Sequence, residues 1–333
     1  MSNKSLDSMI FISKKELKLI KEENKDIYLS KIIKIEGFKK LIVSWNVATP
    51  QQSYIIVQAK VYVQNKKDKK KKWSEWISWG KWGTNIKRGS ESIKYDEVKI
   101  DVDTLSINEG YCGKAIQLRI VSYYDNIEGA ADVRELAITY YKENNDDLNN
   151  KGYELINKLI ETPCISQMQR DERIAHKICS PTSLTMLLNR LGENLKVEDV
   201  AYSCFDYNYN EFGNWTYNVA YAGSLGYKAY VEYGGINSLI REIGNESPVV
   251  VSVKYTNDID NKEYPYVKNA PLTTSGHLIV VCGIEVNKGG KWIMVNDPAG
   301  KDDESVRLKY KFEEFMKAWQ RSNYIMYVIH KNG

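Results

Sequence analysis

Histidine, proline and cysteine are scarce in this chain of 333 residues, which contains 3 His, 7 Pro and 5 Cys. The cysteines are odd in number and include no Cys-x-x-Cys pair, so neither a disulfide framework nor a zinc site is expected. The low proline content and the 43% of hydrophobic residues exclude a low-complexity or largely disordered chain. We therefore expect a folded protein that requires no metal and no organic cofactor.

A large excess of one charge is also absent, because 47 Lys and Arg oppose 43 Asp and Glu, for a net charge of +4. This balance predicts no nucleic-acid partner. The lysine-rich run at 66–72 lies between two apolar stretches and is interpreted as a solvated hairpin loop. Charges interrupt every long apolar run, and the N-terminus lacks the apolar core of a signal peptide, so no membrane span is expected.

Apolar residues recur with period two between residues 38 and 141, which indicates half-buried strands. Turn signals separate several such strands, and no helical pattern interrupts them, so we predict an antiparallel β-sandwich over 36–142 that follows an N-terminal extension at 1–35. The clearest alternating residues are Val57, Ala59, Val61 and Val63, and Ile116, Leu118 and Ile120.

Four tryptophans recur at every third position within this region, at Trp73, Trp76, Trp79 and Trp82. Burial in the core and at its edge is the favoured interpretation, because Trp buries more area than any other side chain. Exposed rings that stack on sugars are the alternative, and they would make the sandwich a binding module for a glycan or protein ligand.

A polar segment at 143–152 is interpreted as a linker. Helical periodicity then begins, with one apolar stripe from Leu184 to Leu191 that stops at Gly192 and a second from Phe312 to Trp319. Apolar runs of strand length occur at 248–253, 277–286 and 292–295. The pattern predicts a single α+β domain over 153–333.

Cys179 lies directly before the first of these helices, with Ser180 as the expected N-cap and Pro181 in the first turn. The partial positive charge of a helix N-terminus favours a thiolate, so Cys179 is the candidate nucleophile. The alternative is a buried cysteine of purely structural role, which is the expected role of Cys164, Cys204 and Cys282.

His277 begins the apolar strand that forms a predicted hairpin with the strand leading to Asp297. A carboxylate at this position would orient the imidazole as the base for Cys179. If the hairpin turn is centred on residues 288–289, Val280 pairs with Asp297, and His277 then lies on the opposite face of the sheet. We therefore expect either a β-bulge, at Gly283 for example, or an Asp297 that lies just beyond the paired strand.

An oxyanion formed at Cys179 would need hydrogen-bond donors, namely its own backbone N–H and an upstream amide. Gln167 is the candidate, with Gln169 as its rival. His176 is a competing base, but it lies in a charged loop without an evident orienting carboxylate on a rigid element.

Six segments resemble, in order and spacing, the bacterial C-thirty-nine-like cysteine peptidases, which are papain-like relatives of the double-glycine leader peptidases. They are ISQ at 165–167, CSPTSLTMLLNRLG at 179–192, GNWTYNVAYAGSLGYKAYV at 213–231, SPVVVSV at 247–253, SGHLIVVCGI at 275–284 and VNDPAG at 295–300. The resemblance implies a papain-like fold over 153–333. LIVSWNVATP at 41–50 and WSEW at 73–76 resemble the β-sandwich that precedes the peptidase domain in some members.

The resemblance implies the catalytic roles residue by residue: Cys179 as nucleophile, His277 as base, Asp297 as orienting acid and Gln167 as oxyanion donor. The chain departs from the family at Ser180, where members usually have glycine. A cytoplasmic location is the default expectation in the absence of a signal peptide, and an extracellular or cell-surface location is the alternative that such relatives suggest.

The leading hypothesis is a thiol hydrolase that cleaves a peptide or isopeptide amide bond in a peptide or protein substrate. The first alternative is an acyltransferase that uses the same residues with an amine in place of water. The second is a non-catalytic protein whose sandwich binds a glycan or a protein and whose peptidase-like domain no longer turns over.

Overall fold

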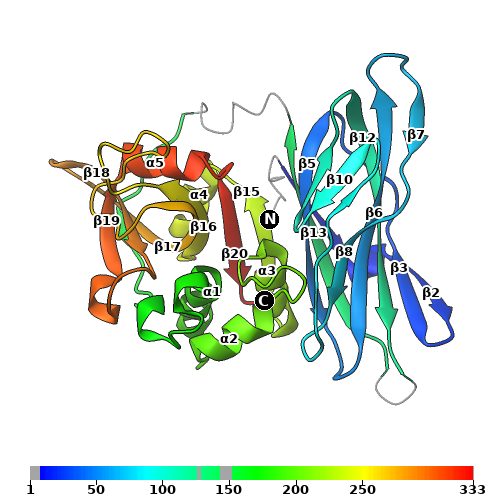
Figure 1. Ribbon diagram of the computed structural model, residues 1–333, viewed down its shortest axis with the longest axis horizontal. Coiled ribbons are helices and arrows are strands. Elements are labelled where there is room, and N and C mark those ends of the chain that lie inside the picture. Colours follow the sequence, from blue (N-terminus) through cyan, green and yellow to red (C-terminus); the bar gives the residue numbers. More distant parts are fainter. Residues whose placement is uncertain (1–7, 126–128, 143–151, 333) are drawn as a thin grey trace. The chain divides into compact units, whose positions relative to one another are not determined.

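The computed structural model describes residues 8–125, 129–142 and 152–332, and contacts divide the chain into two compact units (Figure 1). The N-terminal unit comprises residues 1–145 and 205–231, and the C-terminal unit comprises 146–204 and 232–333. The structure is mostly β, with several antiparallel sheets. The segment 205–231 groups with the N-terminal unit, so this division differs from the predicted domain at 153–333. The predicted linker at 143–152 lies outside the described residues except for Gly152.

Two antiparallel sheets form the N-terminal unit. The first has the order β1-β13-β5-β11-β10-β9, and the second has the order β2-β3-β12-β6-β7, with β4 added on β12 and β8 on β6. The strands are β1 (Met9–Ser13), β2 (Lys18–Glu22), β3 (Lys25–Leu29), β4 (Ile33–Lys34), β5 (Phe38–Ala48), β6 (Tyr54–Asn65), β7 (Lys71–Trp73), β8 (Ile77–Trp82), β9 (Ile93–Lys94), β10 (Val98–Asp101), β11 (Thr104–Ile107), β12 (Tyr111–Tyr123) and β13 (Asp132–Lys142).

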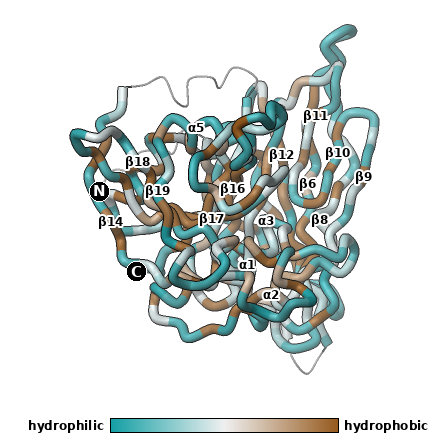
Figure 2. Tube along the Cα trace, turned by 60° about the vertical axis from the view of Figure 1, so that its left-hand side comes forward, coloured by the Kyte–Doolittle hydropathy of each residue, from teal (hydrophilic) through white to brown (hydrophobic). Residues whose placement is uncertain are grey.

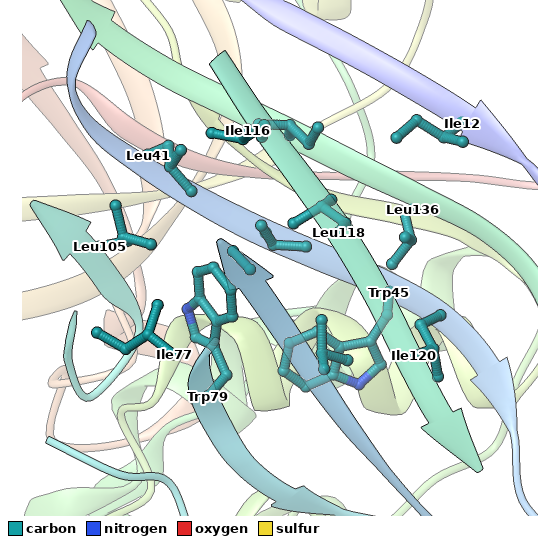
Figure 3. Close-up of a cluster of buried hydrophobic side chains, with 14 of the residues drawn as sticks. Ile12, Leu41, Trp45, Ile77, Trp79, Leu105, Ile116, Leu118, Ile120 and Leu136 are labelled. Carbon is teal, nitrogen blue, oxygen red and sulfur yellow. The ribbon is translucent and has the colours of Figure 1, made fainter. Parts of the chain in front are cut away.

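The two sheets share one hydrophobic core, part of which is drawn in Figure 3. The alternation predicted from the sequence is confirmed, because Val57, Ala59, Val61 and Val63 of β6 are buried while the residues between them are partly exposed. Trp79 and Trp82 are buried to 1% exposure, whereas Trp73 and Trp76 are only half-buried. Core packing therefore accounts for two of the four tryptophans and leaves two with accessible rings.

The predicted N-terminal extension at 1–35 is wrong for the described residues. β1 pairs with β13 of the first sheet, and β2, β3 and β4 belong to the second sheet. These strands have five residues or fewer, and β2, β3 and β4 contain charged residues, so a period-two pattern is weak in this part of the sequence. The predicted hairpin loop at 66–72 is confirmed, since residues 66–70 connect the antiparallel strands β6 and β7.

Helix α3 (Trp215–Ser224) also belongs to the N-terminal unit, and it packs on β5. A side chain at Gly223 would place its Cβ 2.6 Å from the amide oxygen of Asn46, so only glycine allows this close approach. The following strand β15 (Lys228–Tyr233) donates the backbone N–H of Ala229 to Asn46 and that of Val231 to Ser44. The segment 205–231 is thus joined to β5 by both packing and hydrogen bonds.

The C-terminal unit is built on an antiparallel sheet with the order β20-β16-β17-β18-β19, with β14 added on β17. Figure 2 shows hydrophobic colour along β16 and β17, the central strands of this sheet. α1 packs on β17, α5 on β16 and α2 on α1. The elements are β14 (Lys158–Leu159), α1 (Cys179–Arg190), α2 (Val197–Cys204), α4 (Ile236–Gly244), β16 (Val249–Tyr255), β17 (Thr274–Asn287), β18 (Gly290–Asn296), β19 (Arg307–Lys311), α5 (Phe312–Gln320) and β20 (Ile325–His330), with 3-10 turns at η3 (Gln167–Gln169), η4 (Ala175–Lys177) and η5 (Asp303–Ser305). A further 3-10 turn, η1 (Lys14–Glu16), lies in the N-terminal unit.

Both predicted helices and all three predicted strands of this region are present as α1, α5, β16, β17 and β18. Gly192 lies just beyond α1 with φ of +109°, the left-handed conformation expected after a helix C-terminus. No helix among the described residues is long and apolar enough to cross a membrane.

Candidate active site

The β17–β18 hairpin brings Asp297 to His277. Val280 pairs with Asn296, and a bulge between Val281 and Gly283 shifts the register by one residue. Continuing this register places Asp297 opposite Ile279, which lies on the same face as His277 two residues away. Both expected adjustments therefore occur, because the bulge is present and Asp297 lies just past the end of β18.

Only glycine fits at position 283, because the neighbouring strand β14 lies too close to this bulge for a side chain. A Cβ at Gly283 would lie 2.5 Å from the backbone oxygen of Lys158, because β14 crosses close to β17 at this point. A larger residue would push β14 away and disturb the hairpin that carries His277.

The carboxylate of Asp297 is fully buried and accepts four hydrogen bonds. Oδ1 accepts from Nε2 of His277 at 2.8 Å and from the backbone N–H of Ala299 at 3.0 Å. Oδ2 accepts from the hydroxyls of Tyr255 at 2.6 Å and Tyr310 at 2.8 Å. The donors come from β16, β17, β19 and the turn after β18, so four parts of the sheet hold one carboxylate in a fixed orientation.

These donors keep Asp297 ionised despite its burial. Burial alone raises the pKa of this carboxyl, but the charge of His277 and the hydrogen bonds from His277, Tyr255 and Ala299 lower the pKa below its ordinary value. Burial, followed by the nearby Asp297 charge, raises the pKa of Tyr255 and Tyr310 well above the usual range. Both phenols therefore remain donors.

Cys179 is the first residue of α1, with Ile178 as its N-cap. The predicted N-cap at Ser180 is therefore wrong, since Ser180 lies inside the first turn. Pro181 also lies in that turn. Backbone N–H groups of a first turn have no acceptor within the helix, so the lack of an N–H at proline costs no hydrogen bond there. The first turn contains no acidic residue, so the positive end of the helix macrodipole acts on the Cys179 sulfur without local neutralisation.

Cys179 and His277 interact directly. Burial raises the pKa of the Cys179 thiol, but the charge of His277 and a side-chain hydrogen bond with it outweigh burial, and the pKa is lowered. Burial likewise lowers the pKa of His277, but Asp297 and Cys179 reverse the effect and raise it to about 10. Because Asp297 occupies Nε2, the nitrogen left for Cys179 is Nδ1. These shifts favour a thiolate–imidazolium pair.

Two serines of α1 connect the helix to the sheet that carries His277. Ser183 donates its hydroxyl to the backbone oxygen of Leu278 at 3.0 Å, next to the histidine itself. The hydroxyl of Ser180 is fully buried and lies 2.9 Å from the hydroxyl of Tyr327 on β20. The buried hydroxyl of Ser180 therefore has a hydrogen-bond partner.

Gln167 lies between the two sides of the site. Its backbone N–H donates to the oxygen of Pro298, the residue after Asp297, at 2.8 Å. Its side-chain Nε2 donates to the oxygen of Ala175, just before α1, at 2.6 Å, and its Oε1 is buried without a partner among the described residues. An amide nitrogen has two hydrogens, so one N–H remains for a further acceptor. The rival Gln169 is exposed, and its side chain accepts from the backbone of Asp303.

The remaining candidates lie apart from this arrangement. His176 is exposed in η4. Cys204 and Cys282 are fully buried, and burial raises the pKa of Cys282 to about 12, so its thiol stays protonated. No group of three metal-ligating side chains occurs among the described residues, and none of the five cysteines forms a disulfide.

The sequence pattern does not single out Tyr255 or Tyr310. Each lies in a strand with apolar neighbours, where a tyrosine is equally typical of an ordinary core. A signal appears only once the pairing of β16 with β17 and of β18 with β19 is known, because this pairing brings both hydroxyls to Asp297.

Comparisons with known proteins show which families the two parts of the chain match. Residues 159–327 match the model of the Peptidase_C39 like family, and residues 27–139 match that of the Peptidase C39 N-terminal domain. A crystal structure of a protein from Bacillus anthracis that is assigned as a C39-like peptidase is similar at 19% identity and a TM-score of 0.40, covering 54% of this chain and 100% of the other. A search of curated proteins found no match.

Proposed function

Because the chain belongs to the Peptidase_C39 like family, we propose that it is a cysteine-dependent hydrolase that cleaves a peptide or isopeptide amide bond. The single observation that carries this proposal is the connection from Asp297 through His277 to Cys179, in which the pKa of the partly buried thiol is lowered although desolvation alone would raise it. A structural cysteine gains nothing from a buried imidazole held by a carboxylate.

In the proposed mechanism His277 holds the proton of Cys179, and the thiolate attacks the carbonyl carbon of the substrate. The oxyanion accepts hydrogen bonds from the Cys179 backbone N–H and from the second N–H of Gln167. The imidazolium then gives its proton to the leaving amine. Water, deprotonated by the same histidine, attacks the thioester and releases the acid and the free thiolate. Asp297 keeps Nε2 protonated throughout, so that Nδ1 is the nitrogen that exchanges the proton.

We extend the proposal to the architecture of each part of the chain. The helix α1 that carries Cys179 packs on the antiparallel sheet that carries His277 and Asp297, which favours the papain-like interpretation of residues 153–333. The core shared by two antiparallel sheets favours a β-sandwich that serves as a binding module for a glycan or protein ligand.

Hydrolysis is tested by incubating the full chain with a mixture of peptides and identifying the cleavage products by mass spectrometry. The proposal predicts cleavage by the wild type, none by Cys179→Ala, and a transient mass increase on the Cys179 peptide after acid quenching. Intact peptides with both proteins would contradict it.

The same experiment with an added primary amine separates hydrolysis from acyl transfer. The expected product is the free acid even when the amine is present. Accumulation of the amine adduct in preference to the acid would replace the hydrolase by an acyltransferase that uses the same residues.

A further inference from the structure

A hollow of about 410 Å³ opens on the outer face of the second sheet of the N-terminal unit. Its position follows from the strand register, in which Lys34 pairs with Ala115, Ala115 with Tyr62 and Tyr62 with Trp73. Directly paired residues share a face of the sheet, so these four form one row across β4, β12, β6 and β7. The small side chain of Ala115 lies between larger ones, and it leaves the space that forms the hollow.

Apolar and aromatic groups form one side of the hollow. The rings of Tyr62 and Trp73 lie 5.1 Å apart between centroids and are tilted by 41°. Ile32 also lines the hollow, and 57% of its surface is exposed, which is high for an isoleucine. A core position does not explain these groups, because the sheet's other face supplies the core.

The other side of the hollow is cationic. Lys34, Lys71 and Lys114 line it together with a single carboxylate, Glu36, which is 2.9 Å from the ammonium of Lys114. Within the described residues the ammonium groups of Lys34 and Lys71 have neither a hydrogen bond nor an ion pair, so their charges are available to a ligand. The lining carries three positive charges and one negative charge.

The aromatic and cationic character continues along the same face. Lys60, on β6 two residues before Tyr62, places its ammonium 5.0 Å from the ring of Trp73 and 5.2 Å from that of Trp76. Arg119 stacks at 4.2 Å on the ring of Trp76. A ligand longer than the hollow would therefore meet further half-buried rings and further cations.

We propose that this hollow binds a carboxylate-bearing saccharide unit of an acidic glycan. A sugar ring presents C–H groups that pack on Tyr62 and Trp73, its hydroxyls find donors in the lysines and an acceptor in Glu36, and its carboxylate is attracted by Lys34 and Lys71. Glu36 can accept hydrogen bonds from the hydroxyls of a sugar, whereas a phosphodiester has no proton to donate to it, so this carboxylate favours the acidic sugar over a nucleic-acid backbone. The inference specifies the ligand proposed above for the sandwich and does not depend on hydrolysis.

Binding is tested by calorimetry on the full chain with Cys179→Ala, which removes any turnover. The probes are hexagalacturonate, the neutral cellohexaose and a single-stranded oligothymidylate. We expect hexagalacturonate to bind at least about tenfold more tightly than either of the others, which corresponds to about 1.4 kcal/mol.

Variants place the ligand in the hollow. Trp73→Ala removes a ring, and Ala115→Leu fills the space without changing charge or removing a ring, so each should weaken hexagalacturonate binding by about tenfold or more. Tyr209→Ala, which removes an exposed ring of the same unit outside the hollow, should leave binding unchanged. Circular dichroism melts confirm that the variants are folded.

Three results would overturn the inference: no binding of hexagalacturonate, equal binding of cellohexaose, or a preference for the oligothymidylate. Peptide cleavage by the wild type is measured separately, so a failure of glycan binding and a failure of the hydrolase proposal are distinguishable.

Discussion

Asp297 and Asp206 are both fully buried carboxylates that accept four hydrogen bonds, yet their donors differ in kind. Asp206, in the N-terminal unit, accepts from the backbone N–H groups of Ser90 and Asn208, the Ser90 hydroxyl and the Asn214 amide. All of these donors are neutral. One donor of Asp297 is His277, which titrates and which interacts with Cys179 in turn.

This difference shows that burial of a carboxylate does not by itself mark an active site. Asp206 ties the segment 205–231 to the loop around Ser90 within its unit, which is a structural role. Asp297 changes the protonation state of His277, a neighbour that can accept the proton of the nucleophile Cys179. The predictions below ask whether the two carboxylates behave as differently as their partners imply.

Removal of the nucleophile should have the largest effect. Cys179→Ala is expected to lower kcat/KM for any cleaved peptide by at least about 10³-fold, because it removes the thiol whose proton His277 accepts. Cys164→Ala is the matched control and should retain full activity. Residual cleavage of more than about a tenth in Cys179→Ala would place the chemistry elsewhere.

Substitution of the two carboxylates compares them directly. Asp297→Asn should lower kcat by about 10²-fold or more and shift the pH dependence of Cys179, because the amide no longer stabilises the imidazolium. Asp206→Asn should lower the free energy of unfolding by about 1 to 3 kcal/mol and leave the pH dependence of Cys179 unchanged. Denaturant titration and peptide assays measure the two effects. An identical response of the two variants would remove the distinction.

The phenols around Asp297 should have a smaller effect, seen mainly in acid. The pKa of Asp297 is lower in the folded protein than its ordinary value of 3.8, which applies to the unfolded chain. The ionised carboxylate therefore stabilises the fold fully above pH 3.8, and this stabilisation is lost as the pH falls through the lower pKa of the folded state. Tyr310→Phe removes one hydrogen bond to the carboxylate, which should lower the free energy of unfolding by about 1.5 to 3 kcal/mol. Because a donor to the ionised form is lost, the pKa of Asp297 in the folded state should rise toward 3.8. Acid unfolding followed by circular dichroism should therefore begin at a higher pH. Tyr140→Phe, a half-buried tyrosine of the N-terminal unit, is the control.

Ser180→Gly should have the smallest effect. The change removes the hydrogen bond with Tyr327 and adds a glycine to the first turn of α1. We expect a loss of about 1 to 2 kcal/mol in the free energy of unfolding. The pH dependence of Cys179 should not change, because Ser180 interacts with that sulfur through its backbone. A shifted pH dependence would mean that the serine side chain acts on the nucleophile.

The features that could be predicted from the sequence are local or periodic. Helix α1 and its cysteine follow from the leucine stripe and from Pro181, and the β17–β18 hairpin follows from two apolar runs around a glycine turn. Even the bulge could be expected, because only a shifted register brings His277 and Asp297 to one face. Cys179, His277 and Asp297 were therefore within reach of the sequence.

The features that could not be predicted depend on contacts between distant strands. Tyr255 and Tyr310 meet Asp297 only because β16, β17, β18 and β19 are neighbours, and a strand pattern carries no information about its neighbour. The strands at 9–34 are short, so their place in two sheets depends on pairing partners far along the chain. The hollow at Ala115 depends on a row of residues from four strands.

The pH dependence of iodoacetamide alkylation at each cysteine, in the wild type and in His277→Ala, tests the central claim most directly. Cys179 should react rapidly well below pH of about 8.5, the ordinary thiol value, and it should remain reactive as the pH rises, while Cys282 stays inert. In His277→Ala, burial is no longer opposed by a positive charge, so alkylation of Cys179 should slow and its midpoint should move to higher pH. A Cys179 that titrates like an ordinary thiol, or whose reactivity is the same without His277, would contradict the thiolate–imidazolium pair.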